Sequence, residues 1–257
     1  MSKVAFSSDN HLDINKQDFM DIMKRQTEYL ISNDYDFYFF AGDLSNDFEK
    51  TLRFFEDMAI YAGGFVAPFF IAGNHDMGKG ISYSELESLE QSQYLHRQRI
   101  QIGKTTVEGN NGWYDYSFVG DDYPIEEIEH FKNGLWYDRV IQQDGVSDKE
   151  RFETNLEQLR PADILVTHFL PNHHQIKRFK DQPRWDLSNA VMGSDGFGEY
   201  VIENNFKHVI YGHMHINEEF ENGGVSFHNV SVGNKKELND QGFFEVWKNK
   251  LLTLEIF

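Results

Sequence analysis

Five short groups of polar residues each follow an apolar run that is typical of a buried strand. They are rich in carboxylate, amide and imidazole groups, which are nitrogen and oxygen donors suited to divalent transition metals. Loops beyond the carboxyl ends of strands gather at one edge of an α/β sheet, so groups far apart in the sequence can share a site. The five groups are Asp9-Asn10-His11, Gly42-Asp43, Gly73-Asn74-His75-Asp76, His168 and Gly212-His213-Met214-His215.

Each group alone is a weak signal. An Asp after a Gly is often a turn or a helix cap, and a single His after a strand is more often a hydrogen-bonded structural residue than a ligand. The five together carry more weight, because each stands at the end of an apolar run. The chain contains no cysteine, which excludes thiolate ligands, disulfides and thiol nucleophiles. The predicted chemistry is therefore metal binding through nitrogen and oxygen.

The elements that must position these groups follow from the apolar pattern. Helical periodicity separates the early strands, with one apolar face over 19–30 and another over 48–62, which predicts an α/β core. Polar residues split the last segment into Phe243–Trp247 and Leu251–Phe257, which we interpret as a hairpin at the edge of a second sheet. The main strands are predicted at Lys3–Ser7, Phe37–Ala41, Val66–Ala72, Ile164–Thr167, His208–Tyr211 and Val225–Val232.

At 257 residues, the chain is expected to form a single domain over 1–257. The alternation of strands and helices weakens from about 81 to 160, so this segment is predicted to be an insert that shapes the substrate site. It carries a cluster of aromatic residues that we interpret mainly as core, because large aromatics pack more often than they bind ligands. The cluster comprises Trp113, Tyr114, Tyr116, Trp136 and Tyr137.

Composition bounds the function further. Hydrophobic residues make up 40% of the chain and aromatics 15%, which is typical of a globular protein. The N-terminal sequence lacks a basic stretch followed by an apolar one, and no apolar run is long enough to cross a bilayer, so a cytosolic protein without membrane contact is predicted. With 42 acidic and 24 basic residues, the net charge is −18, which makes duplex nucleic acid an unfavourable partner.

The order Asp-x-His, Gly-Asp, Gly-Asn-His-Asp, His, Gly-His-x-His resembles the complete signature of the calcineurin-like metallophosphoesterases, and it spans Asp9 to His215. The resemblance implies a four-layer αββα sandwich. In that fold, two mixed β-sheets are flanked by helices, and the metal site lies at the carboxyl ends of the strands. The expected activity is hydrolysis of a small phosphodiester or phosphomonoester, as a phosphodiesterase or a phosphatase.

The resemblance also implies a role for each site residue. Asp9, His11 and His215 are expected to hold one divalent ion, Asn74, His168 and His213 the other, and Asp43 to bridge both. Residues two apart in an extended segment lie on one side, so His213 and His215 could reach adjacent ions. Manganese, iron or zinc suits this imidazole-rich set best, and nickel or cobalt is also compatible. Gly42, Gly73 and Gly212 are expected to allow sharp turns after the strands.

Hydrolysis is expected to proceed by direct attack of a hydroxide that bridges the two ions. By resemblance, His75 protonates or stabilises the leaving oxygen, and Asp76 hydrogen-bonds to His75 and favours its imidazolium form.

Two other functions stay open. Related enzymes cut DNA with the same metal constellation, although the basic clusters here are short. Some proteins of this fold, such as the retromer scaffold subunit, are non-catalytic interaction platforms. His173 and His174 either border the site or lie in a solvated loop. His96, His130, His208 and His228 are predicted to be surface or hydrogen-bonded residues. The natural substrate and the oligomeric state are left undetermined by the sequence.

Overall fold

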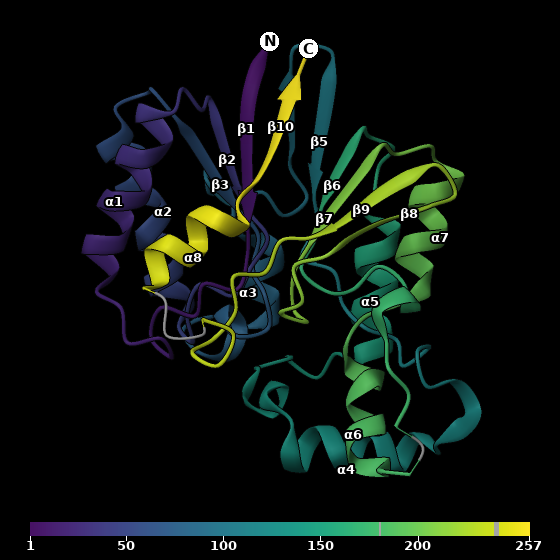
Figure 1. The fold of residues 1–257 in the computed structure, drawn as a ribbon. Helices are drawn as coiled ribbons and strands as arrows, with labels where there is room; N and C mark the ends of the chain where they lie inside the picture. Colours follow the sequence, from purple (N-terminus) through teal and green to yellow (C-terminus); the bar gives the residue numbers. More distant parts are fainter. Residues whose placement is uncertain (180, 239–241) are drawn as a thin grey trace.

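The computed structural model describes residues 1–179, 181–238 and 242–257. Two β-sheets pack against each other, and helices cover the outer face of each sheet (Figure 1). The four-layer sandwich with two mixed sheets, which the sequence predicts, is confirmed. None of the helices in the described ranges is both long and apolar enough to span a bilayer.

In the part of the chain that the structure describes, the first sheet has four strands and the second has six. In the first, the three consecutive strands are parallel, and the C-terminal strand joins the first one antiparallel. In the second, only the two outer strands run antiparallel to their neighbours. The first sheet is ordered β10 (Leu252–Ile256), β1 (Ser2–Ser7), β2 (Phe37–Phe40), β3 (Ala67–Phe70). The second is ordered β4 (Arg99–Ile102), β5 (Thr105–Gly109), β6 (Ile164–Val166), β7 (His208–Tyr211), β9 (Val225–Asn229), β8 (Glu219–Asn222).

Helices α1 (Phe19–Ser32), α2 (Phe48–Ala62) and α8 (Phe243–Lys250) lie outside the first sheet, and α5 (Asp148–Glu157) and α7 (Asp195–Glu203) outside the second (Figure 1). The spacing of apolar residues in the sequence determines which face of each helix packs against its sheet. In α1, for example, Asp18 caps the N-terminus and the buried residues recur at helical spacing. The shorter helices are α3 (Tyr83–Ser88), α4 (Ile125–Leu135), α6 (Pro183–Ser188), and the 3₁₀ turns η1 (Asp76–Gly78), η2 (Gly120–Asp122), η3 (Tyr137–Val140), η4 (His173–Gln175) and η5 (Asn189–Val191).

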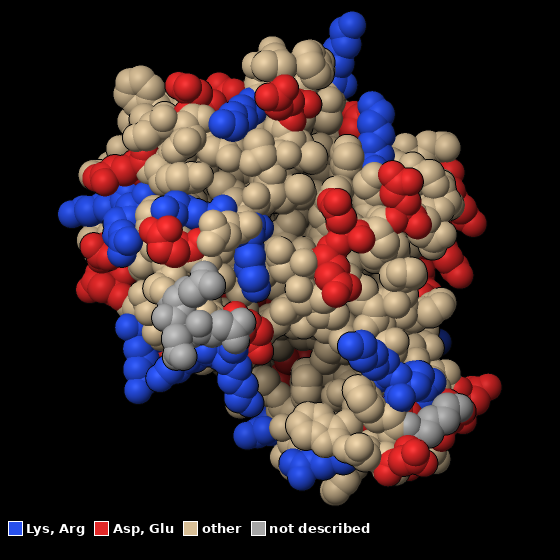
Figure 2. All heavy atoms as spheres, in the orientation of Figure 1, with Lys and Arg blue, Asp and Glu red and all other residues tan. Residues whose placement is uncertain are grey.

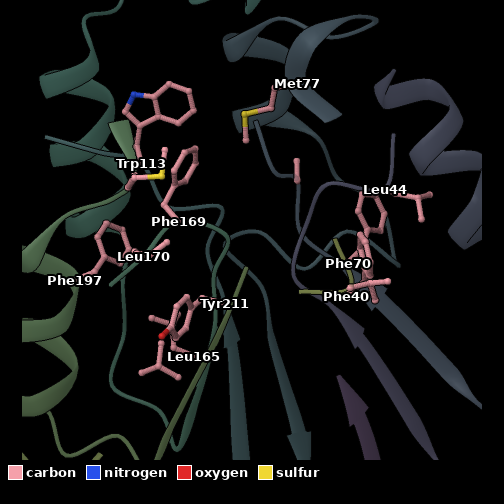
Figure 3. Close-up of a cluster of buried hydrophobic side chains, with 14 of the residues drawn as sticks. Phe40, Leu44, Phe70, Met77, Trp113, Leu165, Phe169, Leu170, Phe197 and Tyr211 are labelled. Carbon is pink, nitrogen blue, oxygen red and sulfur yellow. The ribbon is translucent and has the colours of Figure 1, made fainter. Parts of the chain in front are cut away.

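The core divides according to the pleat of the strands. In β2, Phe39 packs between the two sheets, whereas Tyr38 and Phe40 pack toward the helices. The aromatic ring of Phe55 from α2 contacts both Tyr38 and Phe40. Figure 3 shows part of the helix-side core, with Phe40 and Phe70 in one group and Trp113, Phe169 and Tyr211 in another.

One predicted element is wrong. Phe243–Trp247 is not a strand of a C-terminal hairpin but the first part of helix α8. Its buried residues, Phe243, Val246 and Trp247, have the i, i+3, i+4 spacing of a helix, which the consecutive aromatics of this short run obscure. The second predicted strand is present as β10, and it pairs antiparallel with β1 instead of with its neighbour in sequence.

The segment 81–160 serves two purposes. Its strands β4 and β5 belong to the second sheet, so this part is core. Helix α4 and the turn η3 lie outside the sheets in a lobe beyond the carboxyl ends of the strands (Figure 1). Helix α6 joins the same lobe from outside the predicted range and packs on α4. We refer below to α4, η3 and α6 as the lobe.

A single buried carboxylate ties the loops that follow β2 and β3. The side chain of Asp76 accepts hydrogen bonds from the backbone N–H groups of Asp43 (2.6 Å), Leu44 (3.0 Å), Ser45 (3.1 Å) and Gly73 (2.9 Å). It also accepts one from the Thr51 hydroxyl of α2 at 2.6 Å. Since these donors are buried, no water is available to replace the carboxylate. The conformation of both loops therefore depends on Asp76.

Replacing Asp76 with Asn should lower the free energy of unfolding by about 2–5 kcal/mol, because an NH₂ group then faces backbone N–H donors that have lost their acceptor. The measurement is urea denaturation in the presence of a chelator. The control is Asp144→Asn, at an exposed carboxylate that also accepts a backbone N–H, from Ser84 at 2.8 Å. The control should lose less than about 1 kcal/mol. Equal losses in the two variants would show that Asp76 does not organise the loops.

Candidate metal centre

The five polar groups that the sequence singles out come together where their strands end. Asp9 and His11 follow β1, Asp43 follows β2, and Asn74 follows β3. His168 follows β6, and His213 and His215 follow β7 in the second sheet. The centre is thus shared between the two sheets. Within the described residues, three sets of side chains have potential ligand atoms within 4.8 Å of one another: Asp9, His11 and His215; His11, Asp43 and His75; and Asp43, His168 and His213.

The first set lies around Asp9. Its Oδ1 is 3.2 Å from Nε2 of His215 and 3.7 Å from Nε2 of His11. The Nε2 atoms of the two histidines are themselves 2.9 Å apart. Three donor atoms from three different residues therefore converge on one small volume, as the ligands of a single cation do.

The second ligand set consists of Asn74, His168 and His213, and it lies around His168. Its Nε2 is 3.2 Å from Nδ1 of His213 and 3.2 Å from Oδ1 of Asn74. Oδ2 of Asp43 lies 3.3 Å from the same His168 nitrogen and 3.7 Å from Nε2 of His11, which belongs to the first set. Asp43 therefore lies between the two sets, in the position of a bridging carboxylate.

In three of the predicted ligands, contacts with the protein occupy one side-chain atom and leave another facing the centre. Nδ1 of His168 is 2.8 Å from the carbonyl oxygen of Ala41, and Nε2 of His213 is 3.2 Å from that of Val191. In the neutral form of each ring, an N–H donated to a carbonyl fixes the tautomer, so the other ring nitrogen carries the lone pair. In the same way, Oδ2 of Asp9 accepts hydrogen bonds from the hydroxyls of Ser8 (2.6 Å) and Ser231 (2.8 Å), while Oδ1 faces the histidines.

Five of the seven predicted ligand residues have a left-handed backbone. This conformation is uncommon outside glycine and costs about 1–3 kcal/mol for each residue, so its concentration here indicates a site held in a fixed geometry. The expectation of an extended Gly212–His215 segment is wrong, because His213 and His215 are among the five. Their φ angles are 55° at Asp9, 41° at His11, 66° at Asp43, 70° at His213 and 53° at His215.

The glycines beside the ligands act partly as predicted. Gly42 has a φ of 89°, which agrees with a sharp turn, and a Cβ there would lie 2.6 Å from the backbone nitrogen of Gly73. Gly212 is required for a different reason. Its backbone passes so close to Asp9 that a Cβ would lie 2.2 Å from Oδ2. A side chain at Gly212 would therefore displace a predicted ligand.

The charges of the centre depend on one another. Burial opposes ionisation of Asp43, but the cationic His168 and its neighbours hold the pKa of Asp43 well below its usual range. Burial likewise opposes protonation of His168, but the carboxylate of Asp43 outweighs it and raises the pKa of His168 to about 9. Burial and the charge of His168 lower the pKa of His213 to about 3. Without metal, His168 is thus protonated at neutral pH and His213 is not.

The prediction that Asp76 hydrogen-bonds to His75 is wrong, since the Asp76 carboxylate serves the loop backbones. Nδ1 of His75 instead lies 2.7 Å from Oδ1 of Asn46. The ring of Tyr137 stacks on the imidazole, with the centroids 3.9 Å apart and the planes at 14°. Burial lowers the pKa of His75 to about 4, with Asp43 opposing the shift, so the predicted imidazolium form is not favoured in the metal-free protein.

Three residues at the centre were missed by the sequence interpretation. Asn46 stands three positions after Asp43 in a short loop, and that spacing could have indicated it. Tyr137 was placed in the core with the other aromatics. Trp113 and Tyr114 are fully buried, as predicted, but Tyr137 faces His75. Asp138 accepts a hydrogen bond from Nδ2 of Asn74 at 2.7 Å, and no sequence pattern marks it.

The remaining histidines lie outside the ligand sets. His173 is exposed and pairs with Asp195 at 2.7 Å, and the exposed His174 stacks on Phe220, which agrees with the solvated-loop alternative. His96 is buried with its Nε2 3.0 Å from Glu87. His130 is exposed, and the rings of His208 and His228 have nitrogens 3.1 Å apart. The prediction for these last four is confirmed.

The donor set fits divalent metal ions. Carboxylate oxygens, imidazole nitrogens and an amide oxygen converge here, and these are the donor types that divalent transition metals bind. Figure 2 shows a hollow between the two-sheet body and the lobe, with acidic atoms visible inside it. Small anions could reach the centre from this hollow once cations reverse the local potential.

Binding of divalent ions at pH 7.5 should release at least one proton for each chain, because His168 carries a proton at this pH and must lose it to act as a ligand. Burial opposes protonation of His215, but Asp9 raises its pKa, so His215 adds to the release. Since the pKa of His168 is about 9 when metal is absent, this release should fade as the pH rises through 9. Calorimetric titration of Mn²⁺ in two buffers of different ionisation enthalpy measures it. His208→Gln, outside the centre, is the control and should release as many protons as the parent. Metal binding without proton release at pH 7.5 would contradict this account.

Comparison with known proteins agrees with the fold. Phosphopantetheinyl hydrolase from Mycobacterium tuberculosis matches with a TM-score of 0.73 and 18% identity, over 98% of this chain and 95% of its own. TT1561 of Thermus thermophilus matches with a TM-score of 0.52 and 12% identity, over 99% and 98%. Identities this low show a shared fold alone. No match was found among curated proteins.

The match to a family model covers residues 2–217, and this range includes all seven predicted ligands. It also includes every strand of the two sheets except the last three. The chain therefore belongs to the calcineurin-like phosphoesterase family.

Proposed function

We propose that this protein hydrolyses a small phosphate ester with the help of two divalent metal ions. The observation that carries the proposal is the convergence of two ligand sets on Asp43, with His75 beside them. Asp9, His11 and His215 hold one ion in this proposal, and Asn74, His168 and His213 hold the other. When bound, two such ions supply positive charge for the phosphoryl oxygens and lower the pKa of a water molecule between them.

The chain itself positions the reacting groups. Asp43 is kept ionised by its imidazole neighbours, so its carboxylate can serve both ligand sets. The backbone N–H of His75 donates to Oδ1 of Asp43 at 2.8 Å, which holds the bridging carboxylate and His75 in a fixed relation. A leaving group that departs from phosphorus beside Asp43 is therefore within reach of the His75 side chain.

His75 is proposed to protonate the leaving oxygen. With Oδ1 of Asn46 accepting from Nδ1, the free ring nitrogen is Nε2. The low pKa of His75 is set mainly by burial, and a bound phosphate brings negative charge that favours the protonated ring. His75 thus takes up its proton together with the anionic substrate and returns it to the leaving group. Asn46 and Tyr137 orient the ring, in place of the Asp76 contact predicted from the sequence.

The net charge of −18 favours a compact substrate over a polyanion, because the long-range field repels duplex DNA while a small ester can enter the metal centre. The name of the Mycobacterium tuberculosis neighbour makes a phosphopantetheinyl ester an informative member of a substrate panel.

In a panel assayed after reloading metal-free protein with Mn²⁺, small phosphodiesters should be hydrolysed faster than plasmid DNA. The panel contains an aryl diester, a cyclic nucleotide, a phosphopantetheinyl ester and a phosphomonoester. Metal-free protein serves as the control and should be inactive. Robust metal-dependent cutting of the plasmid without turnover of any small ester would make the protein a nuclease.

His75→Ala should keep most of the bound metal but lose about 10²–10⁴-fold in turnover on a nucleoside or alkyl ester, the usual contribution of a positioned general acid. Its loss on an activated aryl phosphate should be smaller, because that leaving group departs with little protonation. His213→Ala should instead lose metal and activity together, because a ligand has been removed. The measurements are metal content and turnover on both kinds of ester. Full activity of metal-loaded His75→Ala on poor leaving groups would exclude the proposed role and favour the non-catalytic scaffold.

A further inference from the structure

We propose that Asp138 is a positioning residue that fixes the amide of Asn74 so that its oxygen faces the second metal ion. This inference rests on the proposed metal-binding role of Asn74 and adds a residue from the lobe to the centre. Asp138 lies in η3, whereas Asn74 lies in the loop after β3, 64 residues earlier in the chain. The lobe thus becomes part of the metal site as well as its cover.

The contact is short and fully buried. Nδ2 of Asn74 donates to Oδ1 of Asp138 at 2.7 Å, and both residues are only 1% exposed. On the other side of the amide, Oδ1 of Asn74 lies 3.2 Å from Nε2 of His168. Asn74 is therefore held between a carboxylate at its NH₂ end and a predicted ligand at its oxygen end.

The chemistry of the amide makes this contact specific. An asparagine side chain has a donor end and an acceptor end of nearly the same shape, and only the oxygen can bind a cation. A carboxylate offers only acceptors to its neighbour, so it selects the orientation in which the NH₂ group points away from the metal. Without that selection, the amide could turn and present N–H groups to the ion. Contacts of this kind behind a ligand are typically worth about 10–100-fold in metal affinity.

A purely structural role explains Asp138 poorly. Besides Asn74, its carboxylate has the buried hydroxyl of Tyr114 as a hydrogen-bonding neighbour. A fully buried carboxylate costs stability even when it is hydrogen-bonded, so a neutral side chain would serve a purely structural role at least as well. The neighbouring residue provides a second, separate contact, since Tyr137 stacks on His75. Two consecutive residues of the lobe thus contact two consecutive residues of the site loop, Asn74 and His75.

The fit between the lobe and this loop is close. The Tyr137 hydroxyl lies near the carbonyl oxygen of His75, at 3.4 Å, and a Cβ at Gly78 would lie 2.2 Å from the Tyr137 hydroxyl oxygen. Gly78 therefore leaves the space in which η3 reaches the loop.

The test compares Asp138→Ala and Asp138→Asn with a matched control, Asp148→Asn. Asp148 is also a buried carboxylate, at the start of α5. It accepts hydrogen bonds from Trp113 and Lys132 and contacts no predicted ligand. Stepwise Mn²⁺ affinities are measured by calorimetry, and thermal unfolding of the metal-free proteins checks folding. Because both readouts are independent of turnover, they test the role of Asp138 even if no phosphate ester proves to be a substrate.

Asp138→Ala should weaken one of the two Mn²⁺ sites by about 10–100-fold and leave the other within about 3-fold of the parent. Asp138→Asn, which keeps the shape and one acceptor, should lose less, and its metal-free form should unfold no earlier than the parent because a buried charge is gone. Asp148→Asn should bind both ions normally. Two unchanged Mn²⁺ affinities in both Asp138 variants, or an equal loss in Asp148→Asn, would overturn the proposal. Loss of both sites together would also overturn it, because Asp138 contacts only one ligand set.

Discussion

The structure depends on one buried carboxylate that does not itself bind metal in our account. Asp76 collects four backbone N–H groups from the loops after β2 and β3, and these loops carry Asp43, Asn74 and His75. Burial and the nearby charge of Asp43 raise the pKa of Asp76 to about 6, so its ionisation is opposed by the fold it supports. The backbone N–H groups of these loops have a buried acceptor in Asp76, and this allows the loops to hold residues in a strained conformation at the centre.

The centre concentrates features that oppose folding in the metal-free protein. Left-handed residues, buried carboxylates and adjacent imidazoles with nitrogens about 3 Å apart each cost free energy. Cations at the two ligand sets would turn these same features into favourable ones, since negative charge and lone pairs then face positive charge. The large buried aromatic and aliphatic layers of the fold supply stability that offsets these costs.

The order of the motifs implies the four-layer fold and a shared site, and the strand pattern places each of the seven proposed ligands after a strand. The packing of the two sheets brings these strand ends together. The sequence interpretation failed where a contact depends on tertiary packing. The helix α8 was taken for a strand because its short run of aromatics fits both periods. The partner of His75 was assigned to the adjacent Asp76, yet Asn46 supplies it. In the sequence, Tyr137 is one aromatic among several and Asp138 belongs to no motif, since only the placement of the lobe brings them to Asn74 and His75.

The central claim, that two ions share Asp43, is tested most directly by anomalous diffraction from crystals loaded with manganese. The account predicts two anomalous peaks, one among Asp9, His11 and His215 and the other among Asn74, His168 and His213, with the Asp43 carboxylate between them and the peaks about 3.5–4 Å apart. A single peak at saturating manganese, or peaks away from Asp43, would contradict the two-metal centre.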